Sequence, residues 1–140
     1  MKLVIIDGQG GKIGKLLIEK LKNAEIGAEI YAIGTNAIAT SAMMKAGADY
    51  AATGENPVIV NVRDADIVVG PIGIVIADAL LGEITPAMAT AIGQSRAQKV
   101  LLPINKCRNH VVNVKDATVS EIVSEAVQYI KTLDKSVCIG

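Results

Sequence analysis

Short apolar runs alternate with amphipathic segments along the whole chain. Residues 2–7 are almost entirely apolar, which is typical of a strand covered on both faces of a sheet. Residues 12–22 place apolar side chains on one helical stripe and lysines on the opposite side, which predicts a helix. The same reasoning predicts further strands at 28–33, 48–52, 66–70 and 99–104, and further helices at 36–46, 74–92 and 118–133.

Three segments carry further structural signals. At 57–63, valine and isoleucine favour a strand, whereas Asn56 before Pro57 is typical of a helix start. Because parallel strands need a crossover between them, we predict a short helix there. Within 74–92, Thr85 before Pro86 predicts a break and the cap of a new helix. Residues 110–114 are a candidate sixth strand.

Alternating strands and helices predict an α/β fold, with a parallel sheet between two layers of helices. If the chain reverses after the third strand, the strand order is 3-2-1-4-5, and 110–114 adds an edge strand. The 140 residues suit one domain, so we predict a single Rossmann-like domain over 1–140. Ligands of such sheets bind beyond the carboxyl ends of the strands, beside the first strand.

Composition removes several classes of function. Acidic and basic residues are equal in number, and Phe and Trp are absent, so neither a nucleic-acid footprint nor a base-stacking platform is expected. The apolar window 67–81 is too short to span a membrane and contains Asp78. We expect a cytoplasmic protein without a membrane partner, with Cys107 and Cys138 as free thiols. The apolar region 74–92 is expected to form the interface of a homodimer or higher oligomer.

The loop between the first strand and the first helix, DGQGGKIG, is unusually rich in glycine. Gly8, Gly11 and Gly14 form a G-x-x-G-x-x-G pattern. Gly8 would permit a tight exit from the strand, and Gly14 would let the helix pack closely on the sheet. Gly10 or Gly11 would let backbone amides approach a phosphate; alternatively, the glycines only close a tight turn. We predict a nucleotide site at this loop, formed by Gly8, Gln9, Gly10, Gly11, Lys12 and Ile13.

This loop resembles the G-x-x-G-x-x-G version found in NAD(P)-dependent reductases such as dihydrodipicolinate reductase and in extended short-chain dehydrogenases. That resemblance covers about the first quarter of the chain. Over nearly its whole length the sequence is similar to a family of short bacterial Rossmann-like proteins described as a domain of unknown function. The segments that carry this second resemblance are IDGQGGKIGK, GTNAIATSAMMKAGAD, ATGEN, VGPIGIVIADALLGEITPAMATAIGQS and LLPINKC. It implies a fold and no particular reaction.

The end of the second predicted strand lacks the acid that binds ribose hydroxyls in many dinucleotide sites. Gly34, Thr35 and Asn36 stand there instead, and their small polar groups could hold a 2′-phosphate, although no arginine is near. The alternative is that Asn36 caps a helix and Thr35 lies in a turn. On this basis we expect NADP as the cofactor, with NAD as the alternative.

The end of the fourth predicted strand carries a second group of candidates. Gly70, Pro71 and Gly73 either form a wall against a bound cofactor or make a rigid turn into the next helix.

Candidates for chemistry are few. Asp7 ends the first strand and could act as a base, with Glu55 or Glu83 as a second carboxylate. Lys106 beside Cys107 could lower the pKa of the thiol. No metal-ligand cluster is visible in the sequence. These features favour a small nucleotide-binding protein, with NADP(H) as the expected nucleotide and an oxidoreductase activity if it is an enzyme. The alternative is a non-catalytic sensor of a nucleotide or phosphorylated metabolite, or a subunit of an assembly.

Overall fold

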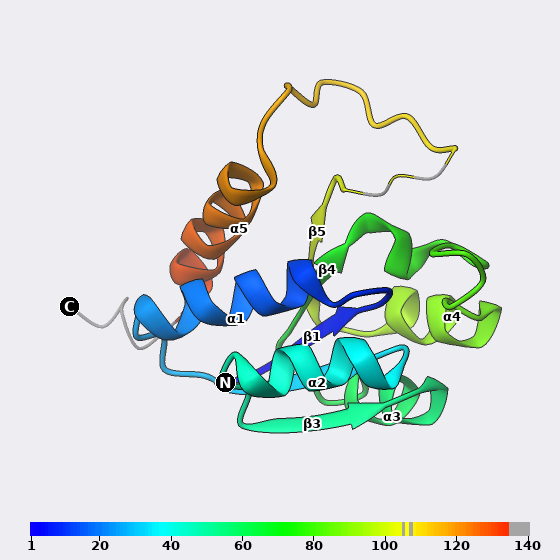
Figure 1. Cartoon of the computed structure of the whole chain (residues 1–140), viewed down its shortest axis with the longest axis horizontal. Coiled ribbons are helices and arrows are strands. Elements are labelled where there is room, and N and C mark those ends of the chain that lie inside the picture. The colour runs from blue at the N-terminus through cyan, green and yellow to red at the C-terminus, as the bar shows by residue number, and fades with distance from the viewer. Residues whose placement is uncertain (105, 107, 135–140) are drawn as a thin grey trace.

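A parallel five-stranded sheet in the order β3-β2-β1-β4-β5 forms the centre of the protein (Figure 1). The computed structural model describes residues 1–104, 106 and 108–134. The side chains of residues 3–6 are fully buried, which explains the continuous apolar run at the start of the chain. The strand order confirms the predicted α/β fold. The strands are β1 (Lys2–Asp7), β2 (Glu29–Gly34), β3 (Tyr50–Thr53), β4 (Ile67–Pro71) and β5 (Gln98–Leu102).

Helices cover both faces of this sheet, and each face has its own apolar cluster. Leu3 and Ile5 of β1 point into one cluster, and Val4 and Ile6 point into the other. This alternation is what a strand buried on two sides requires. One face is covered by α1 (Lys12–Asn23), α2 (Ala37–Lys45) and α5 (Val119–Leu133), and the other by α3 (Glu55–Asn61), the 3₁₀ turn η1 (Ile72–Val75) and α4 (Pro86–Gln94) (Figure 1).

One of the two predicted helix starts has the expected cap, and the other does not. Thr85 caps α4, and its hydroxyl accepts a hydrogen bond of 3.1 Å from the Met88 amide, as predicted. A helix does cross between β3 and β4, but the predicted cap at Asn56 is wrong. Gly54, with a φ of 109°, leaves β3 and caps α3, so Pro57 is the third helical residue. Its missing N–H costs nothing there, because the first amides of a helix have no partner within the helix.

The predicted helix over 74–92 is only half correct. After η1 the chain continues as an irregular segment, residues 76–85, which we call the crossing segment, and α4 begins only at Pro86. Asp78, Leu80, Leu81 and Gly82 have φ values of 65°, 56°, 55° and 86°. A right-handed helix cannot continue through residues with left-handed backbone.

The predicted sixth strand is absent. Residues 110–114, which the structure describes, form no strand and lie in the long connection between β5 and α5 (Figure 1). Asn113, with a φ of 63°, interrupts the extended conformation that a strand would need. Val112 is 76% exposed instead of being packed in a sheet.

The apolar residues of 74–92 pack mostly inside the protein. Leu81 is 94% exposed, but the neighbouring apolar side chains contribute to the core, so the excess of hydrophobic residues is largely accounted for within one chain. A dimer through this region is not shown. Among the described helices, none is both long and apolar enough to cross a lipid bilayer. The buried members of the region are Ile74, Ala79, Leu80, Ile84, Met88, Ala89 and Ile92.

Candidate functional site

The glycine loop leaves β1 at the carboxyl edge of the sheet and turns sharply into α1. The Gly11 amide donates to the Gly8 carbonyl at 2.9 Å, which closes the turn. Gln9 and Gly11 have left-handed φ values of 51° and 73°. Gly8 and Gly11 are buried, whereas Gln9 and Gly10 are exposed. The loop is therefore a tight joint with one exposed tip.

Each of the three motif glycines lies against another part of the chain. A Cβ on Gly8 would lie 2.5 Å from Thr35 Oγ1, and one on Gly11 would lie 2.7 Å from the Cα of Ala39 in α2. A Cβ on Gly14 would collide with Met43 of α2, which agrees with the packing role predicted for that glycine. At Gly11, the missing side chain makes room for the backbone of α2 rather than for a phosphate.

Asp7 is buried beneath this loop and caps the start of α1. Its Oδ1 accepts a hydrogen bond of 2.8 Å from the Gly8 amide, and its Oδ2 accepts one of 2.7 Å from the Gly14 amide. Burial raises the pKa of Asp7 above its usual value, although the amide hydrogen bonds act in the opposite direction. Because backbone amides engage both oxygens, Asp7 holds the start of α1 in place, and its role as a base stays a prediction.

Glu83 reaches the same loop from the crossing segment. Its Oε1 accepts hydrogen bonds from the Gln9 amide at 3.0 Å, the Thr35 hydroxyl at 2.6 Å and Asn36 Nδ2 at 2.8 Å. Burial alone would raise the pKa of Glu83, but these three hydrogen bonds together lower it below its usual value. An ionised acid therefore lies at the end of β2, although it comes from residue 83 and not from 34–36.

The residues after β2 do not form an open phosphate site. Asn36 caps α2, since its Oδ1 accepts a hydrogen bond of 2.9 Å from the Ala39 amide. Its Nδ2 also donates to the Gln9 carbonyl at 3.0 Å. Thr35 and Asn36, which were expected to hold a 2′-phosphate, hold the Glu83 carboxylate instead. A 2′-phosphate bound by Thr35 and Asn36 would lie against the Glu83 carboxylate and be repelled by its negative charge. This arrangement therefore argues against the NADP expectation.

The other predicted wall residues are also part of tight joints. A Cβ on Gly34 would collide with Thr40, and one on Gly70 would collide with the Ile6 carbonyl. Pro71 and Gly73 are buried where β4 turns into η1. These positions fit the alternative of a rigid turn. Glu55, the other candidate carboxylate, is exposed in the first turn of α3.

The loop is open at Gly10. Among the described residues, apart from the two chain neighbours of Gly10, a Cβ placed there would come within 4 Å of Lys12 Cγ alone, at 4.0 Å. Within the described residues, the backbone N–H groups of Gly10 and Lys12 donate to no other group. Lys12 and Lys15 are exposed, and the first turn of α1 contains no acidic residue. These features make the start of α1 an open, positively polarised surface.

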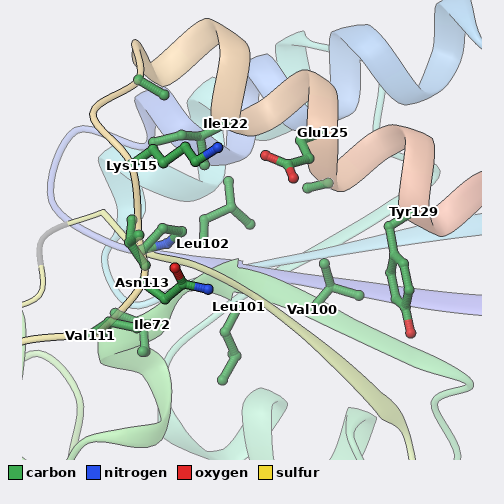
Figure 2. Close-up of a pocket in the computed structure, with 14 residues that line it drawn as sticks. Ile72, Val100, Leu101, Leu102, Val111, Asn113, Lys115, Ile122, Glu125 and Tyr129 are labelled. Atoms are coloured by element: carbon green, nitrogen blue, oxygen red, sulfur yellow. The ribbon is translucent and has the colours of Figure 1, made fainter.

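A separate groove of about 620 Å³ runs along β5 and α5 (Figure 2). Ile72 places one end of it beside the carboxyl end of β4, and Tyr129 lies near Val100 at the other end (Figure 2). The sequence does not predict this groove, because one wall comes from residues 111–117, which include part of the predicted strand 110–114. The lining residues are Ile72, Val100, Leu101, Leu102, Pro103, Val111, Asn113, Val114, Lys115, Ala117, Ile122, Glu125, Ala126 and Tyr129.

The thiol chemistry predicted near β5 is not tested by the structure. Lys106 is half-buried, and its carbonyl accepts a hydrogen bond of 2.9 Å from the Asn109 amide. Cys107 and Cys138 lie outside the described residues, so their roles stay predictions. No group of three or more His, Cys, Asp or Glu in the described part of the chain could hold a metal ion.

Comparisons with known proteins place the chain in a family. No curated protein matches it. Among solved structures, a dodecameric FMN-dependent Ubix-like decarboxylase from Escherichia coli O157:H7 is 15% identical, covers 95% of this chain and 94% of its own, and has a TM-score of 0.46. AibC is 16% identical, covers 95% of this chain and 39% of its own, and has a TM-score of 0.49. The model of the family named Domain of unknown function (DUF3842) matches residues 2–135, and the chain therefore belongs to that family.

Proposed function

We propose that this protein binds a nucleotide, with a phosphate at the exposed tip of the glycine loop. The observation that carries the proposal is the open start of α1. The Gly10 and Lys12 amides have no partner in the described chain, and Gly10 is exposed. Amides in this position bind anions because the helix dipole adds to their own positive ends. Lys12 and Lys15 would add favourable charge.

The position of the loop in the sheet supports the same function. β1 pairs with β2 on one side and with β4 on the other. The first three strands therefore extend the sheet in one direction, and β4 and β5 extend it in the opposite direction from β1. The connection after β1 leads to α1 on one face, and the connection after β4 leads to the other face. Crevices at such points are the usual ligand sites of open α/β sheets.

The residues at this edge favour binding over catalysis. Asp7 accepts hydrogen bonds from two amides and Oε1 of Glu83 accepts three, so both carboxyl groups hold the described part of the loop in place. This observation favours the second sequence-based candidate, a non-catalytic nucleotide or phosphometabolite sensor, over an NAD(P)-dependent oxidoreductase. Self-association, as a dimer or a larger assembly, stays a prediction that sedimentation velocity tests.

Calorimetry with a small panel of nucleotides tests the proposal. The probes are NAD, NADP, ATP, FAD, FMN and S-adenosylmethionine, titrated into wild type and Gly10→Val. A Cβ at Gly10 would meet Lys12 Cγ at an ordinary contact distance of 4.0 Å and does not face a left-handed φ, so the variant should fold while covering the free amides. Gly93→Val is the matched control, because Gly93 is surrounded by open space.

We expect wild type and Gly93→Val to bind at least one probe with equal affinity. Gly10→Val should bind that probe at least about tenfold more weakly, the loss of roughly one charge-assisted hydrogen bond. Absence of binding by every probe, or equal binding by the two valine variants, would contradict the proposal.

A further inference from the structure

We propose that Glu83 is the ribose-binding acid of this site, so the protein selects nucleotides with free 2′- and 3′-hydroxyls over 2′-phosphorylated ones. The inference rests on the proposed nucleotide site and names the class of nucleotide that it takes. An acid for this purpose normally stands at the end of the second strand. Here that position carries Thr35, and the acid is supplied from the connection after β4.

The first support is the place of the Glu83 carboxylate. Its Oε1 is held between the Gln9 amide of the glycine loop and the two side chains that follow β2, Thr35 and Asn36. A nucleotide with a phosphate at Gly10 would extend its ribose along this edge. The hydrogen bonds that described residues donate to Glu83 all end on Oε1, which leaves Oε2 for hydroxyl donors.

The second support is that the fold makes room for this carboxylate. A Cβ on Gly8 would lie 3.0 Å from Glu83 Oε1, in addition to its conflict with Thr35. A glycine at this position thus lets the Thr35 hydroxyl and the Glu83 carboxylate lie close to the end of β1. The first glycine of the motif therefore serves the acid at residue 83, and the two features belong to one arrangement.

The third support is the backbone that delivers Glu83. Leu80 and Leu81 hold left-handed φ values, which bulky residues seldom adopt. The conformation is closed by hydrogen bonds from the Asp78 amide to the Ile84 carbonyl at 2.7 Å and from the Ile84 amide to the Ala79 carbonyl at 3.1 Å. Ala79, Leu80 and Ile84 are buried and anchor the crossing segment. Glu83 is thus presented by a firmly packed element.

The chemistry follows from charge and geometry. A carboxylate oxygen accepts hydrogen bonds from the vicinal hydroxyls of a ribose, and these bonds are strengthened by its charge. A 2′-phosphate in the same place would bring a second negative charge to within a few ångströms and would be repelled. NAD and NADP differ only in that phosphate and are therefore the matched pair of probes.

Calorimetry of NAD and NADP with wild type, Glu83→Gln and Glu55→Gln tests the inference. Wild type should bind NAD at least about tenfold more tightly than NADP, the effect of one charge-assisted contact. Glu83→Gln removes the charge at nearly constant shape. It should bring the affinities for NAD and NADP within about threefold of each other, which is under half of the difference in binding free energy expected for wild type. Glu55→Gln, which alters an exposed glutamate on α3, should keep the wild-type ratio.

The outcomes separate the inference from the proposed function. Wild type that binds NADP as tightly as NAD, or a ratio unchanged in Glu83→Gln, would overturn the inference and leave nucleotide binding intact. Binding of another nucleotide of the panel without binding of NAD would overturn the inference alone, and binding of no nucleotide of the panel would overturn both. Should circular dichroism show that Glu83→Gln is unfolded, ATP and 2′-deoxy-ATP are compared on wild type. Weaker binding of the deoxy nucleotide supports the inference, and equal binding overturns it.

Discussion

The hydroxyl of Thr35 donates a hydrogen bond of 2.6 Å to Glu83 Oε1, although 48 residues separate the two along the chain. This bond joins the end of β2 to the crossing segment that follows β4, and both lie against Gly8. The glycines of the loop therefore have two purposes. Gly8, Gly11 and Gly14 let the chain approach itself closely, and Gly10 leaves the start of α1 open.

Gly8→Ala is expected to lower the free energy of unfolding by about 1–3 kcal/mol, the usual cost of overpacking. The added Cβ would lie 2.5 Å from Thr35 Oγ1 and would force the hydroxyl and Glu83 apart. Urea denaturation measures the change. Gly10→Ala is the control and should stay within about 0.5 kcal/mol of wild type. Equal stability of the two variants would show that Gly8 is not packed as described.

Gly11→Ala is expected to be more destabilising than Gly8→Ala. The left-handed φ of 73° costs an alanine about 1–2 kcal/mol, and the new Cβ would also press on the α2 backbone at Ala39. Thermal and urea unfolding of the two variants side by side give the order. A Gly11→Ala protein as stable as Gly10→Ala would contradict this account of the loop.

Glu83→Gln should lower stability at neutral pH and have less effect in acid. The pKa of Glu83 is lower in the folded protein than in the unfolded chain, because three donors favour the ionised carboxylate. Its contribution is therefore present above the unfolded-state pKa of about 4.3 and is lost as the pH falls through the lower folded-state pKa. Urea unfolding of both proteins at pH 7 and at about pH 3 tests this sign. A difference that grows in acid would contradict it.

The strand order and most helices could be predicted because burial on both faces leaves a strong pattern in β1 and β4. The crossing segment could not be predicted, because leucines such as Leu80 and Leu81 favour a helix and nothing in the neighbouring sequence indicates their left-handed backbone. Glu83 was considered only as a second carboxylate, because its partners Gln9 and Thr35 are distant in the sequence. The lack of an acid after β2 is the one sequence feature that indicates an acid supplied by another segment of the chain.

Thr85→Ala is expected to cost about 1 kcal/mol, because the threonine hydroxyl caps α4 through the Met88 amide. Thr90→Ala in the same helix is the control, since Thr90 is exposed and alanine favours helix. Thermal melts of the two variants provide the comparison. If both shift equally, Thr85 does not stabilise the start of α4 as a cap.

Titration of the ¹⁵N-labelled protein with NAD, followed by amide chemical shifts, tests the central claim most directly. The account predicts saturable shifts at the Gly10 and Lys12 amides, with smaller shifts at Gln9 and around Glu83, and little change at Tyr129 in the groove along α5. Shifts confined to Lys115 and Tyr129, or no shifts with any nucleotide of the calorimetry panel, would contradict nucleotide binding at the glycine loop.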